Sequence, residues 1–361
     1  MKKYLSKASA FCFVILAVSL VAYALSIRLS SVADAINGTF SVGIRFILSC
    51  LTYPLPFSLF EVLIIISPLL LVLLIFMMVK RGNDRPSRVR GILSVLSVIS
   101  IIFTSYIFTL GVGYHTTPVA EKLGIYEDNE ISTDELYDTL NIIVDEINLL
   151  ADKIDFDGVE SRMSYSADDL NRRIISAYNS LNDRYGVLTN YNSRVKPVHF
   201  STVMSDLGIT GIYSFFTGEA NVNVEYPDYC LAFSSAHELA HQRGIARENE
   251  ANFIAFLVCI SSSDDYLKYS GYLNIYEYLA SDLYALDKEL YSGVISRLSP
   301  VAIADMRAAN SVYQKHKDSP LGRINERLND AYLKANGTDG VVTYGYVVRL
   351  AVSYYQQQNN R

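Results

Sequence analysis

Long uninterrupted apolar runs dominate the first third of the chain. Residues 8–27, 57–79 and 91–113 each form a run long enough to cross a bilayer, which takes about 20 apolar residues. The second run contains Glu61 near its start and Pro68 inside it, and the other two carry no charge. This pattern predicts three transmembrane helices, and a signal peptide is disfavoured because the first run is too long and lacks a cleavage motif.

Residues 40–57 are also apolar, but Arg45, Pro54 and Pro56 interrupt them. We expect this stretch to be too broken to span the membrane. Two interpretations remain open, a helix that lies in the membrane interface and a loop that packs on the spans.

From residue 114 onward, helical periodicity replaces the continuous apolar runs. Within 132–154 the apolar positions recur in steps of three and four, which places them on one face of a helix. The same reasoning predicts helices at about 167–185, 235–243, 248–261, 274–290, 300–317, 320–335 and 343–357. Two β-rich stretches, 211–216 and 220–225, predict a small sheet. The expected fold is mainly α, with three transmembrane helices followed by a helical domain that contains a small β-sheet.

The charge is divided in the same way as the hydropathy. Residues 1–113 carry ten Lys or Arg and three Asp or Glu, a net +7, whereas residues 114–361 carry 21 and 34, a net −13. We therefore expect a membrane anchor at 1–113 and a separate acidic domain at 114–361. The chain as a whole has a net charge of −6, which argues against nucleic acid as a partner.

Basic residues also predict the orientation of the anchor. Three lysines lie within the first seven residues and five Lys or Arg lie within 80–90, whereas the stretch between the first two spans has only Arg28 and Arg45. Loops rich in Lys and Arg stay in the cytoplasm. With three crossings, the N-terminus is expected to be cytoplasmic and the C-terminal domain extracytoplasmic, in a multi-pass protein of the cell membrane.

The sequence His237-Glu238-Leu239-Ala240-His241 forms an HExxH motif. Four residues make about one helical turn, so both imidazoles project from one face and could hold a zinc ion. Glu238 is then expected to act as a general base toward water. Two other interpretations remain open: a pair of surface histidines, and a capping box in which Ser235 and Glu238 begin the helix.

A third ligand is expected soon after the motif. Arg247 stands where a metzincin has its third histidine, so that class is excluded. Glu248 and Asn252 share one face of the next helix, and Glu250 points about 160° away from it. We therefore predict Glu248 as the ligand and Asn252 as a hydrogen-bonding partner of a histidine, with Glu250 as the alternative ligand.

The segment Glu248-Asn249-Glu250-Ala251-Asn252 resembles the ExxA(D/N) signature of gluzincin peptidases, in which the first glutamate binds the metal. The chain as a whole resembles the family of the domain of unknown function 3810, bacterial multi-span proteins with a C-terminal HExxH domain. The resemblance is carried by residues 55–61, 211–223, 236–253, 269–273 and 340–345. It implies that the helical domain with the small β-sheet is zincin-like, zinc-dependent and peptidase-like, and it names no substrate.

Other residues are weaker candidates for substrate or transition-state contacts. Zincins often bind an extended peptide along an edge strand, so Tyr213 within 211–216 and the nearby Glu219 are candidates, although an ordinary strand explains them equally. Tyr344 is the first candidate for stabilising an oxyanion and His316 is the second.

The expected function is a membrane-anchored zinc metalloendopeptidase that hydrolyses peptide bonds with metal-activated water. Its expected partners are the lipid bilayer and a peptide or protein substrate at the outer face of the membrane. The alternative is a non-catalytic zinc-binding envelope protein, or a signalling or assembly protein of the membrane.

Overall fold

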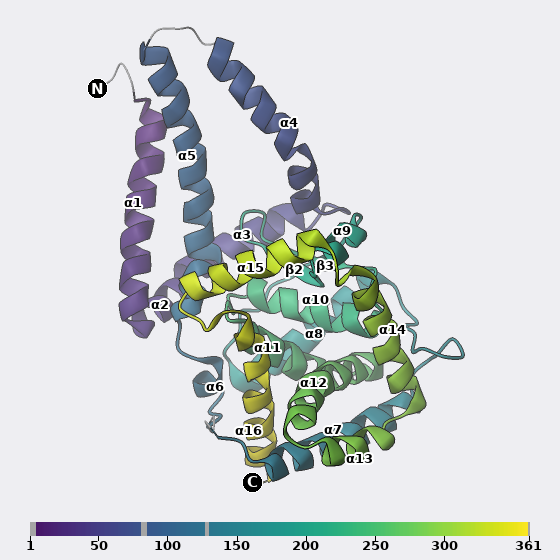
Figure 1. Ribbon diagram of the computed structural model, residues 1–361. Helices are drawn as coiled ribbons and strands as arrows, with labels where there is room; N and C mark the ends of the chain where they lie inside the picture. The colour runs from purple at the N-terminus through teal and green to yellow at the C-terminus, as the bar shows by residue number, and fades with distance from the viewer. Residues whose placement is uncertain (1–4, 81–84, 127–129, 360–361) are drawn as a thin grey trace. The chain divides into compact units, whose positions relative to one another are not determined.

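A computed structural model describes residues 5–80, 85–126 and 130–359, and the chain divides into two compact units (Figure 1). The first unit contains Met1–Thr117 together with Ser214–Glu219, and the second contains Pro118–Tyr213 and Ala220–Arg361. The structure is mainly helical with one three-stranded sheet, as the sequence predicts.

The first unit consists of apolar helices. They are α1 (Lys7–Arg28), α2 (Ser30–Ile36), the π-helix η1 (Asn37–Ser41), α3 (Val42–Thr52), α4 (Leu59–Lys80), α5 (Arg85–Thr109) and the 3-10 helix η2 (Gly111–His115). In the described part of the chain, four helical stretches are long and apolar enough to cross a membrane: Lys7–Arg28, Ser30–Thr52, Leu59–Phe76 and Ser87–Thr109. Several N-terminal helices could therefore span a membrane.

The stretch Ser30–Thr52 overlaps residues 40–57, which the sequence predicted not to span. Its helical path is continuous enough to qualify by length and hydropathy, so the predicted count of three spans is not confirmed. Arg45 in α3 is fully buried, and its guanidinium donates to the side-chain and main-chain oxygens of Asn37 at 2.8 and 3.0 Å. Figure 1 shows α3 running across the direction of α1 and α5. This direction suits a helix that lies in the membrane interface.

A turn from the predicted C-terminal domain belongs to the first unit. The carbonyl of Phe215 accepts hydrogen bonds from the hydroxyls of Ser105 and Thr109 at 2.9 and 2.8 Å. The carboxylate of Glu219 accepts from the backbone N–H groups of Leu59 and Phe60, at 3.0 and 2.8 Å, and so caps the N-terminus of α4. These contacts hold the turn against α4 and α5.

The second unit is built around two buried helices, α11 (Glu248–Ile260) and α12 (Asp265–Leu286). Residues 250–259 of α11 are all buried, because α8, α10, α12 and α16 pack around this helix. The other elements of the unit are α6 (Val119–Lys122), α7 (Thr133–Ala151), α8 (Ala167–Tyr185), α9 (Ser201–Asp206), α10 (Asp228–Gln242), α13 (Lys288–Ser296), α14 (Pro300–His316), α15 (Pro320–Ala335), η3 (Gly340–Tyr346) and α16 (Val347–Asn359).

The sheet contains β1 (Val195–Val198), β2 (Gly211–Ser214) and β3 (Glu219–Asn223), in the order β1-β3-β2. Strands β1 and β3 are parallel, with Val195 opposite Ala220. The two predicted strands correspond to β2 and β3. β1 was missed because it is only four residues long and contains Lys196 and Pro197, residues that are rare in strands.

Helix starts follow the capping chemistry of the sequence. Ser132 and Glu135 form the predicted capping box, and Pro300 and Pro320 stand in the first turn of their helices. Two starts were predicted too late. α10 begins at Asp228 and α12 begins at Asp265, where the side chain of Asp264 accepts from the N–H of Leu267.

Candidate metal centre

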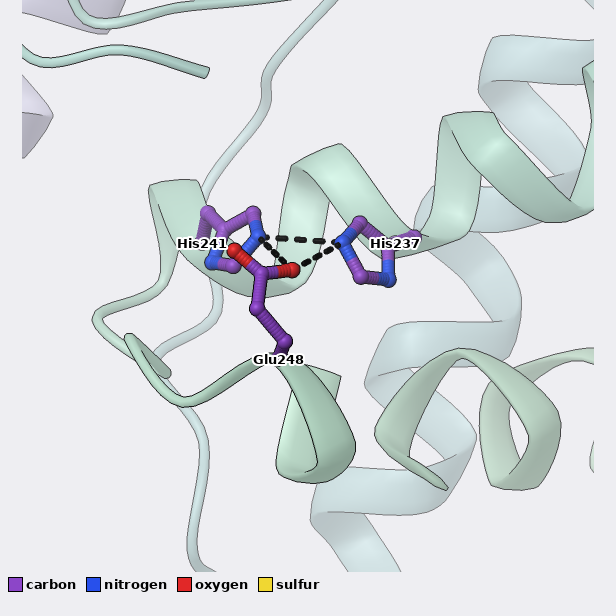
Figure 2. Close-up of side chains that lie close together, drawn as sticks. All are labelled: His237, His241 and Glu248. Atoms are coloured by element: carbon purple, nitrogen blue, oxygen red, sulfur yellow. Dashed lines mark hydrogen bonds and ion pairs between the residues drawn. The ribbon is translucent and has the colours of Figure 1, made fainter. Parts of the chain in front are cut away.

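The HExxH motif lies on the last turns of α10, a helix buried along most of its length. His237 and His241 are one turn apart, and their rings meet edge to face with centroids 4.7 Å apart. Their Nε2 atoms face one another at 3.0 Å (Figure 2). Both imidazoles therefore aim at a common point beside the helix.

A tight turn brings a third donor to this point. Gly244 has φ +93°, a left-handed conformation that glycine adopts without steric cost, and it reverses the chain after α10. The N–H of Ile245 donates back to the carbonyl of Ala240 at 3.1 Å, which closes the helix end. The turn places Glu248, the first residue of α11, against both imidazoles (Figure 2).

The distances within this group fit a tetrahedral metal site. Oε2 of Glu248 lies 3.2 Å from Nε2 of His237 and 3.4 Å from Nε2 of His241. In a tetrahedral zinc site with ligand bonds of about 2.0–2.2 Å, neighbouring ligand atoms lie about 3.3–3.6 Å apart. The three observed spacings agree with that edge length to within a few tenths of an ångström. We call these three residues the histidine–glutamate cluster.

The alternative ligand, Glu250, is turned away from the cluster as the helix geometry predicts. Its Oε1 accepts from the guanidinium of Arg247 at 2.7 Å and from the N–H of Val119 at 2.9 Å. Among the described residues, the metal-binding group has only the three members of the histidine–glutamate cluster. The choice of Glu248 rather than Glu250 is thus the one that the geometry favours.

The predicted role of Asn252 is wrong. Its amide donates to the hydroxyl of Tyr278 on α12 at 3.2 Å rather than to a histidine. Asn252 stands one turn further along α11 than Glu248, where its short side chain faces α12 instead of α10. The carbonyl of Ile245 takes the expected place, since it lies 2.8 Å from Nδ1 of His241 and fixes that ring.

The cluster is buried and strongly coupled electrostatically. Burial alone lowers the pKa of His241, but the carboxylate of Glu248 outweighs this effect, and the net result is a pKa raised to about 9. For Glu248, burial favours the neutral acid. The nearby His241 and the hydrogen bonds from both imidazoles reverse this, and they hold the pKa of Glu248 well below its usual range.

Glu238 lies beside the cluster and against strand β2. It is 4% exposed, and burial raises its pKa to about 7 although His237 and His241 oppose the shift. The backbone of Tyr213 in β2 hydrogen bonds to its carboxylate. A Cβ added to Gly211 would lie 2.5 Å from Oε1 of Glu238, so the strand can come this close only because residue 211 is glycine.

The capping interpretation of Glu238 is excluded. α10 begins at Asp228, so Ser235 and Glu238 are inside the helix, and the hydroxyl of Ser235 donates to the carbonyl of Leu231 at 2.7 Å. The pair of histidines is also not a solvated surface feature. Their side chains are only 12% and 9% exposed.

The weaker candidates for substrate or transition-state contacts lie in different parts of the structure. Glu219 caps α4 in the first unit, and the hydroxyl of Tyr344 accepts from the amide of Asn329 at 3.5 Å. His316 lies between the carboxylates of Asp206 and Glu225, at 2.7 and 3.1 Å. Tyr213 meets Glu238 through its backbone.

Two positions at the site were missed by sequence reasoning. Gly211 was seen only as the start of a strand, and Ile245 contributes a main-chain carbonyl, which no side-chain pattern can reveal. A glycine opening a predicted edge strand was the available sign of a close approach by another group.

The sequence profile of one protein family, described as "Protein of unknown function (DUF3810)", matches residues 37–352. This chain belongs to the DUF3810 family. The DUF3810 match covers the helices from η1 to α5, the sheet, the histidine–glutamate cluster and the first six residues of α16. No curated protein and no solved structure matches the chain.

Proposed function

We propose that this protein is a membrane-anchored, zinc-dependent metalloendopeptidase of gluzincin type. The observation that carries the proposal is the spacing of three ligand atoms from His237, His241 and Glu248 at 3.0, 3.2 and 3.4 Å. Buried Glu238 stands on the same helix next to His237.

The donor set suits zinc, which prefers imidazole nitrogen and carboxylate oxygen and is often held in catalytic sites by two histidines and a glutamate. Zinc bound there would supply Lewis-acid chemistry, polarising a carbonyl and acidifying water. Three protein ligands leave a coordination position for solvent or substrate, whereas structural zinc sites are closed by four.

Glu238 is suited to move the proton. Burial raises the pKa of its carboxyl to about 7, so near neutral pH it can accept a proton from water and return it to the leaving amine. Its Oε2 is buried and has no hydrogen-bond partner among the described residues, which leaves one oxygen available for this exchange.

Strand β2 is suited to bind an extended peptide. It stands at one edge of the sheet and passes Glu238 at Gly211. A peptide added as a further strand would use main-chain hydrogen bonds and thus tolerate varied side chains. Tyr213 on this strand and Tyr344 remain the proposed candidates for contacts with the substrate or the oxyanion.

The charge distribution supports an extracytoplasmic catalytic domain. The N-terminal lysines assign the N-terminus to the cytoplasm. If Ser30–Thr52 also crossed the membrane, the five Lys or Arg of 80–90 would then lie outside the cytoplasm, against the rule for basic loops. Three crossings by α1, α4 and α5 keep both basic segments inside. A reporter fused after Arg361 should then be active only outside the cytoplasm, and activity confined to the cytoplasm would refute this topology.

Metal analysis of the full-length protein in detergent tests the site. After stripping and reloading, we expect one zinc per chain in the wild type and in Glu250→Gln, and loss of zinc in Glu248→Gln. Glu250→Gln is the matched control because it removes a buried carboxylate two residues away. Retention of zinc by Glu248→Gln would reject the ligand assignment.

Glu238→Gln tests catalysis separately. We expect this variant to bind zinc as tightly as the wild type and to cleave no peptide in a mixed peptide library read by mass spectrometry. If the wild type also binds zinc without cleaving, the non-catalytic zinc-binding alternative replaces the peptidase.

A further inference from the structure

Helix α15 has an unusual distribution of polar and apolar side chains. Its inward face carries one fully buried apolar residue, Leu333, and is otherwise polar or small: the amide of Asn325 donates to the carbonyl of Leu207 at 3.0 Å, and the amide of Asn329 donates to Tyr344 at 3.5 Å. Gly322 packs so closely that an added Cβ would lie 3.0 Å from the carbonyl of Asp206. The helix is therefore attached to the second unit mainly by its polar side.

The opposite face of α15 is apolar and exposed. Leu321, Ile324 and Leu328 are 47%, 56% and 64% exposed, and their spacing of three and four residues places them in one line along the helix. Ordinary surface helices bury such a line against their own domain. We call these three residues the α15 apolar stripe.

Basic residues flank the α15 apolar stripe. At about 100° per residue, Arg327 lies about 60° around the helix from Ile324, and Arg323 lies on the same flank. Lys334 and Asp330 are also on this flank and pair with one another at 2.7 Å, which leaves the two arginines as its net charge. The acidic Glu326 lies about 160° from Ile324, on the far side. Arg323 and Arg327 are both exposed. An apolar line with a cationic border is typical of helices that lie in the interface of a bilayer, where the cations meet lipid phosphates.

Chain connectivity keeps the second unit near a bilayer. The chain passes between the units three times, at Thr117 and Pro118, at Tyr213 and Ser214, and at Glu219 and Ala220. The first unit holds several helices that could span a membrane. A lipid surface would thus always be available to this chain as an apolar partner.

We propose that α15 lies in the membrane interface, with the α15 apolar stripe against acyl chains and with Arg323 and Arg327 on lipid phosphates. This attachment is independent of the histidine–glutamate cluster and of any peptidase activity. It gives the second unit a lipid contact of its own in addition to the spans.

Tryptophan fluorescence tests the proposal, because the chain contains no tryptophan and a single introduced one reports without background. The full-length Leu328→Trp variant is reconstituted into nanodiscs of phosphatidylcholine and phosphatidylglycerol, with and without brominated acyl chains. Leu286→Trp is the matched control, since Leu286 at the end of α12 is 63% exposed and Leu328 is 64% exposed. We expect several-fold stronger quenching by brominated lipid in Leu328→Trp than in Leu286→Trp.

Equal quenching in the two variants would overturn the proposal. A blue-shifted emission of Leu328→Trp that brominated lipid does not quench would also overturn it, if the shift increases with the number of chains per nanodisc. A second copy of the chain would then cover the α15 apolar stripe. Ile324→Trp provides a second position on the same face. The double variant Arg323→Gln/Arg327→Gln, combined with Leu328→Trp, should lose most of the quenching if the cations hold the helix on phosphate, and unchanged quenching would refute that role.

Discussion

Zinc affinity should depend steeply on pH, because the proton on His241 competes with the metal. In the histidine–glutamate cluster the pKa of His241 is raised to about 9 by Glu248, and a metal ligand must be the neutral imidazole. Each pH unit below about 9 therefore lowers the affinity about tenfold, or about 1.4 kcal/mol. From pH 9 to pH 7 the expected loss is about a hundredfold, or about 2.7 kcal/mol.

The assay is competition with a chelator of known protonation behaviour, on the full-length protein in detergent, at several pH values from 6 to about 10. The logarithm of the affinity should rise with a slope near one and level off above about pH 9. Calorimetry at pH 7 in two buffers of different ionisation enthalpy should count about one proton released per zinc. Glu250→Gln should show the same slope as the wild type. A flat affinity between pH 7 and pH 9 would refute the reasoning, since His241 would then carry no proton for zinc to displace.

Three further predictions follow from single contacts. Gly211→Ala should push the carboxylate of Glu238 aside, because the new Cβ would lie 2.5 Å from Oε1; we expect zinc binding to persist and peptide cleavage to fall about a hundredfold. Glu219→Gln should weaken the cap of α4 and cost about 1–2 kcal/mol, seen as a lower Tm of the full-length protein in detergent. Asn252→Leu should lose the hydrogen bond to Tyr278 and about 1 kcal/mol of stability while zinc content stays at the wild-type level, and zinc loss would restore the role first predicted for Asn252.

Helix bounds were predicted well where the sequence contains residues that typically begin or end a helix. α8 ends before Gly186 and α15 starts at Pro320, and both helices have the predicted bounds. The start of α12 was placed too late because its first turns are held by Asp264 and by burial rather than by a simple periodic pattern. Whether Ser30–Thr52 spans cannot be decided from the pattern, since Arg45 finds its partners in Asn37 only after folding.

The site was predictable to the extent that helix geometry determines it. The spacing of His237 and His241 and the 160° between Glu248 and Glu250 follow from 3.6 residues per turn, so the sequence favoured the carboxylate that the structure places beside both histidines. Asn252 was assigned wrongly because its partner depends on which helix packs beside α11, and that is tertiary information.

Helix α15 shows a different reason why sequence was insufficient. Its periodicity predicts an apolar face correctly, but periodicity alone implies that this face is buried. The structure places Asn325 and Asn329 inward together with Leu333, and leaves Leu321, Ile324 and Leu328 exposed. Only the packing of α9 and η3 against the polar side reveals the reversal.

The contacts that hold residues 215–218 have a practical consequence for the design of a truncated, soluble protein. A truncated protein that starts at Pro118 would lack Ser105 and Thr109, the donors to Phe215, and the backbone amides that Glu219 satisfies. Strand β2 runs from Gly211, beside Glu238, directly into that loosened loop. Excising the hydrophobic helices would therefore relax the strand that lies against Glu238, so biochemical work should retain the entire polypeptide.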